Sequence, residues 1–191
     1  MNYLQSFRIN NPIKLAAVGA GGKSSFLFQL AKQLPGKKII STTTHISIEQ
    51  SHAGDIRLQG DDPLLVEKII SAPQNAIIVI AGTKEEHDRI NGPSEDQLKD
   101  LSENRKLQNI SFLIEADGAK RMSLKAFGEN EPVVPHWIDT IVHIIGWNAI
   151  GKPVNNSTIF RVDNYCTFTS QKNNDLITFS SITDMLLHPN G

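Results

Sequence analysis

A glycine-rich stretch that ends in a lysine and a serine is the strongest chemical signal in the sequence. It reads Gly19-Ala20-Gly21-Gly22-Lys23-Ser24 and lies between a short apolar run and a segment with helical periodicity. Glycines let a phosphate approach the backbone closely, and the N–H groups at a helix start attract anions. Lys23 would neutralise phosphate charge, and the Ser24 hydroxyl would bind Mg²⁺. We therefore predict that this loop binds the phosphates of a nucleoside triphosphate.

The spacing of the glycines differs from that of the common Walker pattern, G-x-x-x-x-G-K-[ST]. That pattern needs a glycine where Ala17 stands. The shorter pattern G-x-x-G-K-[ST], typical of Mur ligases, fits better. A dinucleotide-binding loop fits less well, because Ser24 replaces its last glycine and no acidic residue closes the second apolar run. The alternative interpretation is a structural turn with a lysine on the surface.

Two carboxylates follow a later apolar run. Glu115 and Asp117 come directly after residues 112–114 (FLI). A carboxylate at such a strand end holds Mg²⁺ directly or through water, or orients the attacking water. Residues two apart in an extended chain face the same way, so the pattern does not decide which acid contacts the metal. We predict that Lys23, Glu115 and Asp117 are the catalytic groups.

Hydroxyl and basic side chains at two further points complete the predicted site. The run 41–45 (STTTH) ends another apolar segment, where a threonine would bind Mg²⁺ or sense the γ-phosphate. Lys120, Arg121 and Lys125 follow the acids and would hold phosphate or an anionic substrate. Alternatively, these groups are a polar strand end and solvated surface charges. The predicted nucleotide ligands are Gly19, Ala20, Gly21, Gly22, Lys23, Ser24, Ser25, Thr43, Thr44, Lys120 and Arg121, and the predicted metal ligands are Ser24, Thr43, Glu115 and Asp117.

The predicted site residues follow continuous apolar runs, in which apolar and polar residues do not alternate. These runs predict strands at 13–18, 38–42, 56–58, 76–81, 110–114 and 139–145, and helices at 24–34, 63–70, 94–106 and 183–187, with a loop over 82–93. Such runs are typical of parallel strands covered on both faces, whose carboxyl ends meet at one edge. We predict an α/β fold with a mostly parallel sheet and helices on both faces, a P-loop NTPase-like three-layer sandwich. Residues 1–191 would form one domain.

Composition narrows the class of protein. The formal net charge is −1 over 191 residues, which gives no reason to expect a nucleic-acid partner. A single cysteine fits a reducing compartment, and no apolar run reaches the length of a membrane span. The six histidines show no zinc spacing. We expect a cytoplasmic protein without a membrane partner.

Several segments together resemble the YqeC-like family, described as accessory proteins of selenium-dependent molybdenum hydroxylases. They are residues 18–25 (VGAGGKSS), 41–46 (STTTHI), 114–121 (IEADGAKR), 124–127 (LKAF), 131–135 (EPVVP) and 149–153 (AIGKP). The resemblance implies a P-loop nucleotide-binding fold, and a molybdenum hydroxylase or its cofactor-maturation proteins as partner. Family members usually continue past an H-P-x-G segment like 188–191. We therefore expect this chain to lack C-terminal elements of the family, and the choice between ATP and GTP stays open.

Three functions follow from these patterns. The first is a Mg²⁺–NTP-binding, NTP-hydrolysing accessory protein for hydroxylase maturation. The second is a small-molecule kinase or Mur-like ligase, which the loop spacing and the Lys120–Arg121 pair suggest. The third is a non-catalytic binding module or chaperone that uses nucleotide only for stability. The sequence leaves open whether the chain is an NTPase, a phosphotransferase or no enzyme.

Overall fold

The computed structural model describes residues 2–190, whose contacts divide into two compact units. The first unit contains the chain up to Ala17, together with Ser24–Ala116 and Val134–Val142. The second contains Val18–Lys23, Asp117–Val133 and the chain from His143 onward. That the chain behaves as one domain stays a prediction, and a single cooperative unfolding transition is its test.

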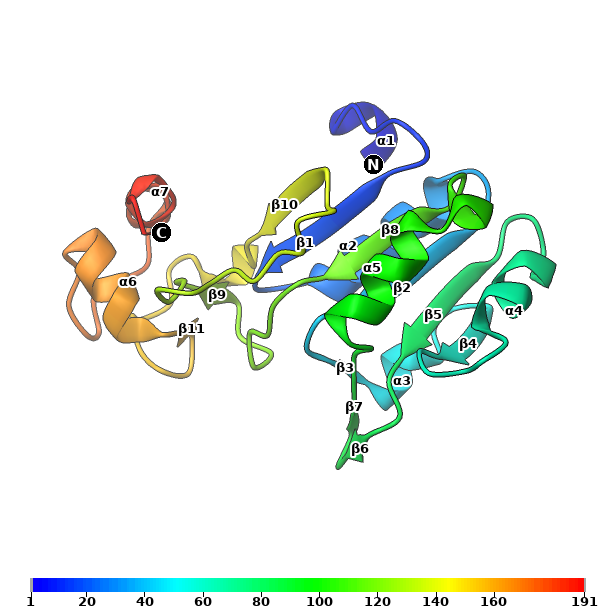
Figure 1. Cartoon of the computed structure of the whole chain (residues 1–191). Helices are drawn as coiled ribbons and strands as arrows, with labels where there is room; N and C mark the ends of the chain where they lie inside the picture. The colour runs from blue at the N-terminus through cyan, green and yellow to red at the C-terminus, as the bar shows by residue number, and fades with distance from the viewer. Residues whose placement is uncertain (1, 191) are drawn as a thin grey trace. The chain divides into compact units, whose positions relative to one another are not determined.

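A six-stranded sheet forms the centre of the first unit (Figure 1). Its order is β10-β1-β8-β2-β5-β4, and the neighbours from β1 to β4 pair in parallel. Residues of β2 and β5 are buried throughout, as expected for strands covered on both faces. The strands are β1 (Lys14–Gly19), β2 (Lys38–Thr42), β4 (Ile56–Gln59), β5 (Ile77–Ala81), β8 (Ser111–Glu115) and β10 (Thr140–Ile144); the last residues of β1 and β10 are counted with the second unit.

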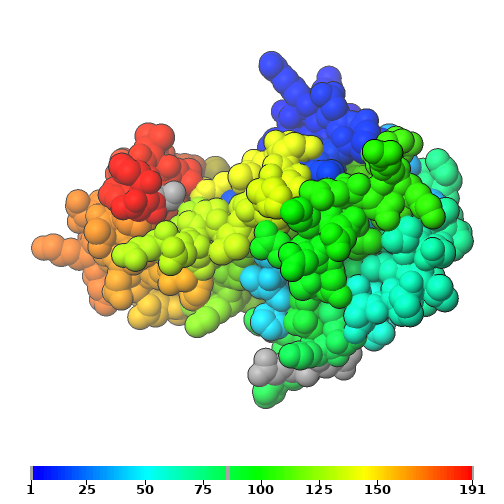
Figure 2. Space-filling model, viewed as in Figure 1, coloured from blue at the N-terminus to red at the C-terminus, as the bar shows by residue number. Residues whose placement is uncertain are grey.

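Helices cover both faces of this sheet, which confirms the predicted α/β three-layer architecture. Helices α4 (Leu65–Ser71) and α5 (Glu95–Glu103) pack on one face, where Leu98 and Phe112 share a buried cluster. Helix α2 (Lys23–Gln33) lies behind the strands in Figure 1 and buries Leu27 and Leu30 completely. In Figure 2, green residues in the region of α5 cover the middle of the visible face of this unit. A capping box begins α5, because Ser94 and Gln97 exchange hydrogen bonds.

The prediction of a loop over 82–93 is wrong. Residues Arg89–Asn91 form β7, which pairs antiparallel with β3 (His45–Ser47) and with β6 (Glu85–Glu86). This small sheet buries Ile90 completely. In the otherwise polar stretch 82–93, this apolar residue was the one sign of a strand. The unit also contains α1 (Tyr3–Ser6), α3 (Ile48–Ser51) and the short 3₁₀ helix η1 (Arg105–Leu107).

The second unit has a core of its own. Its elements are β9 (Leu124–Lys125), η2 (Trp147–Ala149), β11 (Ile159–Phe160), α6 (Val162–Thr169) and α7 (Phe179–Leu187). Strands β9 and β11 pair in parallel, and Tyr165 of α6 is fully buried, with its hydroxyl donating to Ser181 of α7 at 2.7 Å. Helix α6 was not predicted, and α7 begins four residues before the predicted start because Thr178 caps it. Among residues 2–190, no helix combines the length and apolar character that crossing a membrane requires.

Candidate functional site

The glycine-rich loop needs its glycines for backbone reasons. Gly19, Gly21 and Gly22 have φ values of 87°, 84° and 132°, which residues with a side chain rarely adopt. A Cβ on Gly21 would lie 2.3 Å from the Cα atom of Gly146, so the two backbones are in close contact. Within the described chain, Gly21 and Gly22 are exposed, and their amides donate to no protein acceptor. The loop therefore offers two amides without a protein partner directly before the first residue of α2, Lys23.

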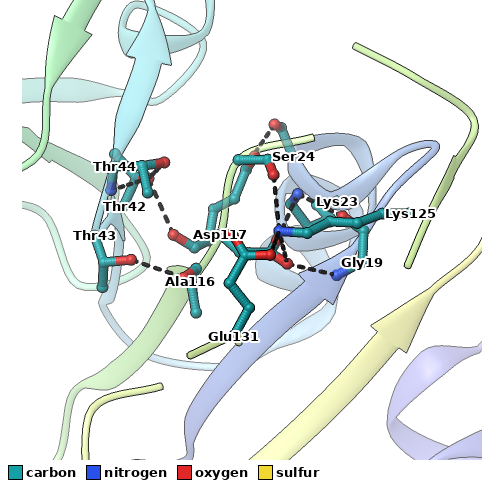
Figure 3. A network of polar contacts seen from close by, with 12 residues as sticks. Gly19, Lys23, Ser24, Thr42, Thr43, Thr44, Ala116, Asp117, Lys125 and Glu131 are labelled. Atoms are coloured by element: carbon teal, nitrogen blue, oxygen red, sulfur yellow. Dashed lines mark hydrogen bonds and ion pairs between the residues drawn. The ribbon is translucent and has the colours of Figure 1, made fainter. Parts of the chain in front are cut away.

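Lys23 and Asp117, which both belong to the second unit, form an ion pair. The Lys23 Nζ atom lies 2.8 Å from Asp117 Oδ1 and donates to the Gly19 carbonyl at 2.7 Å. The other oxygen, Asp117 Oδ2, accepts from the Gly19 amide at 3.2 Å and from Lys125 Nζ at 2.9 Å. Figure 3 shows both lysines pointing toward this one carboxylate. All three charged side chains are almost completely buried, and buried charges persist only when paired.

The row of charges continues beyond Lys125. Lys125 Nζ lies 3.2 Å from Glu131 Oε2, and Arg161 donates to the same carboxylate oxygen from Nε at 2.9 Å. Burial alone raises the pKa of Glu131, but the hydrogen bond from Arg161 and the charge of Lys125 together hold that pKa below its usual value. Cations and carboxylates thus alternate from Lys23 to Arg161. This row has three cations and two anions, so one positive charge is in excess.

His143 borders the same network. A Cβ on Gly19 would lie 2.4 Å from its Cδ2 atom, and the imidazole packs 5.0 Å from the Phe127 ring. Burial lowers the pKa of His143, the charges of Lys125 and Lys23 lower it further, and Asp117 opposes them. The ring is therefore neutral at neutral pH.

Ser24 and Glu115 meet in the first unit. The Ser24 hydroxyl donates to Glu115 Oε2 at 2.5 Å. Glu115 is the last residue of β8, which lies between β1 and β2 in the sheet, and its side chain is half-buried. Because β1 precedes the glycine-rich loop, the strand order brings the start of α2 to the carboxyl end of β8. The structure thus brings Ser24 and Glu115 together, and their role as metal ligands stays a prediction.

The threonines hold the end of β8. Thr42 Oγ1 donates to the Glu115 carbonyl at 3.0 Å, and Thr43 Oγ1 donates to the Ala116 carbonyl at 2.9 Å (Figure 3). The Thr44 amide donates to Thr42 Oγ1 at 3.1 Å. These bonds fix the backbone beside the Glu115 side chain. A direct role of Thr43 or Thr44 toward nucleotide or metal stays a prediction.

Other predicted residues lie outside these two groups of contacts. Ser25 is exposed on α2. Lys120 and Arg121 are exposed, both with left-handed backbone (φ 47° and 62°), and the Lys120 ammonium lies 5.2 Å from the centre of the Phe160 ring. Their contact with a nucleotide also stays a prediction.

The sequence did not predict that His143 lies beside this network, nor that Arg161 pairs with Glu131. Arg161 lies thirty residues after Glu131, at a left-handed position before α6. No spacing rule connects these residues, because the pair forms only through the packing of the second unit. The one available signal was a charged residue between the apolar residues Phe160 and Val162.

The donors available for a metal are oxygens. Among the described residues, no group of three or more His, Cys, Asp and Glu side chains could hold a metal ion. Mg²⁺, however, is usually held by one or two protein oxygens together with substrate phosphates and water. The Ser24 hydroxyl and the Glu115 carboxylate are oxygen donors of this kind, so their chemistry fits Mg²⁺.

The fold and the site define an α/β protein with a glycine-rich, lysine-containing turn between its first sheet strand and the helix that follows. The model of the family described as YqeC protein matches residues 15–163, and the chain belongs to the YqeC family. It is 28% identical over 183 residues to the protein named "Uncharacterized protein YqeC" of Escherichia coli (strain K12). That match covers 94% of this chain and 70% of the relative. No solved structure matches the chain.

Proposed function

We propose that the chain binds a nucleoside triphosphate with Mg²⁺ through the loop 19–24. The observation that carries this proposal is the 2.5 Å hydrogen bond between Ser24 and Glu115. A hydroxyl directly after a glycine–lysine loop, paired with a carboxylate at the end of the adjacent parallel strand, is the arrangement that Mg²⁺–nucleotide sites use. A purely structural turn would not require an acid at this point.

The loop supplies the phosphate-binding groups in this proposal. The amides of Gly21 and Gly22 and the N-terminus of α2 offer hydrogen-bond donors and a partial positive charge. Ser24 and Glu115 would hold Mg²⁺, which supplies charge neutralisation on the terminal phosphates when bound. This assigns the metal to Glu115 rather than Asp117, because Asp117 is already held by two lysines.

Lys23 changes partner when phosphate binds. Its ammonium rests on Asp117 in this structure, and a buried carboxylate left alone would be strongly destabilised. Lys125 stays within 2.9 Å of the same carboxylate, so Asp117 remains paired when Lys23 turns to a phosphate. The second lysine therefore lowers the free energy needed to move the first one.

Hydrolysis and cellular role extend this proposal. With the terminal phosphate held by Lys23 and Mg²⁺, catalysis of phosphoryl transfer to water rests on positioning and electrostatic stabilisation. The resemblance described above gives the setting, which is the maturation of a molybdenum hydroxylase. The alternative of a module that binds nucleotide without hydrolysis differs in one readout, the release of inorganic phosphate.

A thermal-shift panel of ATP, GTP and CTP, each with and without Mg²⁺, tests the proposal. A ligand that binds the folded state raises the melting temperature, and we expect the largest rise for a triphosphate with Mg²⁺. Phosphate release measured in parallel separates an NTPase from a binding module. A panel without any Mg²⁺-dependent rise rejects the proposal.

A further inference from the structure

Two aromatic rings of the second unit are exposed side by side. Trp147 is 73% exposed and Phe179 is 57% exposed. Their ring centres are 5.0 Å apart with planes at 64°, so the edge of one ring meets the face of the other. Large apolar side chains exposed as a pair are unusual on a protein surface and often mark a binding site.

Both rings stand on rigid elements. Trp147 begins η2, whose Ala149 is fully buried, and Phe179 is the first residue of α7, whose Ile182 and Met185 are buried in the same cluster. Thr178 caps α7 through a capping box, which fixes the helix start that carries Phe179. Burial of these neighbouring residues therefore fixes the backbone that carries each ring.

The aromatic pair is connected to the glycine-rich loop. Gly146, the residue before Trp147, lies against Gly21 so closely that a Cβ on Gly146 would be 3.1 Å from Gly21 Cα. The Gly146 amide donates to the Ser123 carbonyl at 2.8 Å, which fixes this segment. Trp147 thus stands one residue from a backbone that touches the proposed phosphate site, within the same compact unit.

We propose that Trp147, supported by its contact with Phe179, forms the platform on which the nucleobase of the bound nucleotide stacks. The inference rests on the proposed function, since the phosphates on the loop would bring the base to this side of Gly146. Every base has a flat π-face, and stacking on aromatic side chains tolerates differences between bases. The platform provides affinity for the base as a class and does not itself select ATP or GTP. The neighbouring Asn148 is exposed and offers an amide to the edge of the base.

Comparing the affinity for nucleotide with that for inorganic tripolyphosphate separates the contribution of the platform from that of the loop. Tripolyphosphate has the charge but lacks the base. We expect wild-type protein to bind MgATP or MgGTP more tightly than magnesium tripolyphosphate, and Trp147→Ala to weaken nucleotide binding by about 5- to 100-fold. Tripolyphosphate affinity should not change in this variant. Trp147→Phe should keep most of the nucleotide affinity, because a flat ring remains.

Two further measurements strengthen the test. Leu187→Ala is the matched control, because Leu187 is 79% exposed at the other end of α7 and should leave nucleotide affinity unchanged. The sequence has two tryptophans, and Trp137 is buried, so quenching of the exposed Trp147 should dominate the fluorescence change on nucleotide binding. Trp147→Phe should abolish that quenching.

The possible outcomes are distinguishable from one another. If wild type binds both ligands and Trp147→Ala binds nucleotide as tightly as before, the platform is wrong and the loop proposal stands. If wild type binds neither ligand, the proposed function fails and the platform fails with it. If Trp147→Ala changes only the oligomeric state in light scattering, the rings form an interface between copies of the chain and the platform is rejected.

Discussion

The Asp117 carboxylate lies 2.8 Å from the ammonium nitrogen of Lys23, and both side chains are buried to more than nine-tenths. The lysine of a predicted phosphate loop is thus held by an acid, while Gly21 and Gly22 of the same loop are exposed. Lys125 contacts the same carboxylate and also Glu131. It therefore has two carboxylate partners, whereas Lys23 has one in this row of charges.

Replacing Lys125 should destabilise the protein more than replacing Lys23. Lys125→Met removes contacts to two carboxylates, although Asp117 keeps Lys23 and Glu131 keeps Arg161, so we expect a loss of about 3 kcal/mol from two charge-assisted contacts. Lys23→Met leaves Asp117 paired with Lys125, so we expect a loss of about 1–2 kcal/mol. Urea unfolding of the two variants measures the difference. Equal losses would show that Lys125 does not hold Asp117 independently.

The glycines of the loop differ in what surrounds them. Gly21→Ala places a Cβ 2.3 Å from Gly146 Cα at a positive φ, whereas a Cβ on Gly22 meets open space. A positive φ costs about 1–2 kcal/mol at either position, and only Gly21 adds the contact with Gly146. We expect Gly21→Ala to lower the free energy of unfolding clearly more than Gly22→Ala. A larger loss for Gly22→Ala would contradict the close approach of the two backbones.

Ser24 and Ser25 are neighbours with different surroundings. Ser24 donates to Glu115, whereas Ser25 is exposed. In the proposed site, Ser24→Ala removes a metal ligand, so the extra thermal stabilisation that Mg²⁺ adds to nucleotide should fall by more than half. Ser25→Ala serves as the control and should behave as wild type. If both variants keep the full magnesium effect, Ser24 is not a metal ligand.

The lowered pKa of His143 predicts that the free energy of unfolding decreases as the pH falls. Its pKa in the folded state is lowered, first by burial and then by Lys125 and Lys23. The unfolded chain therefore binds this proton more readily, and stability is lost as pH falls below about 6.5, the ordinary value for histidine. His143→Gln should flatten the dependence of unfolding free energy on pH between about 5 and 7. An unchanged slope in His143→Gln would count against a neutral imidazole at this position.

Local signals predicted much of the fold. The apolar runs of β2 and β5, the capping box at Ser94 and the glycine-rich turn are decided within a few residues, and the structure contains all of them. Tertiary pairing decided the rest. Residues 89–91 become a strand only because β3 lies beside them, and α6 gave no clear amphipathic pattern.

The candidate site was predictable to a similar degree. The residues on the loop and at the end of β8 could be named because their positions follow from strand order. The different partners of Glu115 and Asp117 could not be predicted, since Lys125 reaches Asp117 from a separate strand, β9. Arg161 and His143 lie still further along the chain and contact this network only in the folded state.

Calorimetric titration of MgATP and MgGTP into wild-type protein and into Lys23→Ala tests the central claim most directly. We predict that wild type binds at least one of them, that removing Mg²⁺ weakens the affinity, and that Lys23→Ala, folded as judged by its unfolding transition, loses at least about tenfold in affinity. Absence of binding to wild type, or unchanged affinity in folded Lys23→Ala, would contradict the account.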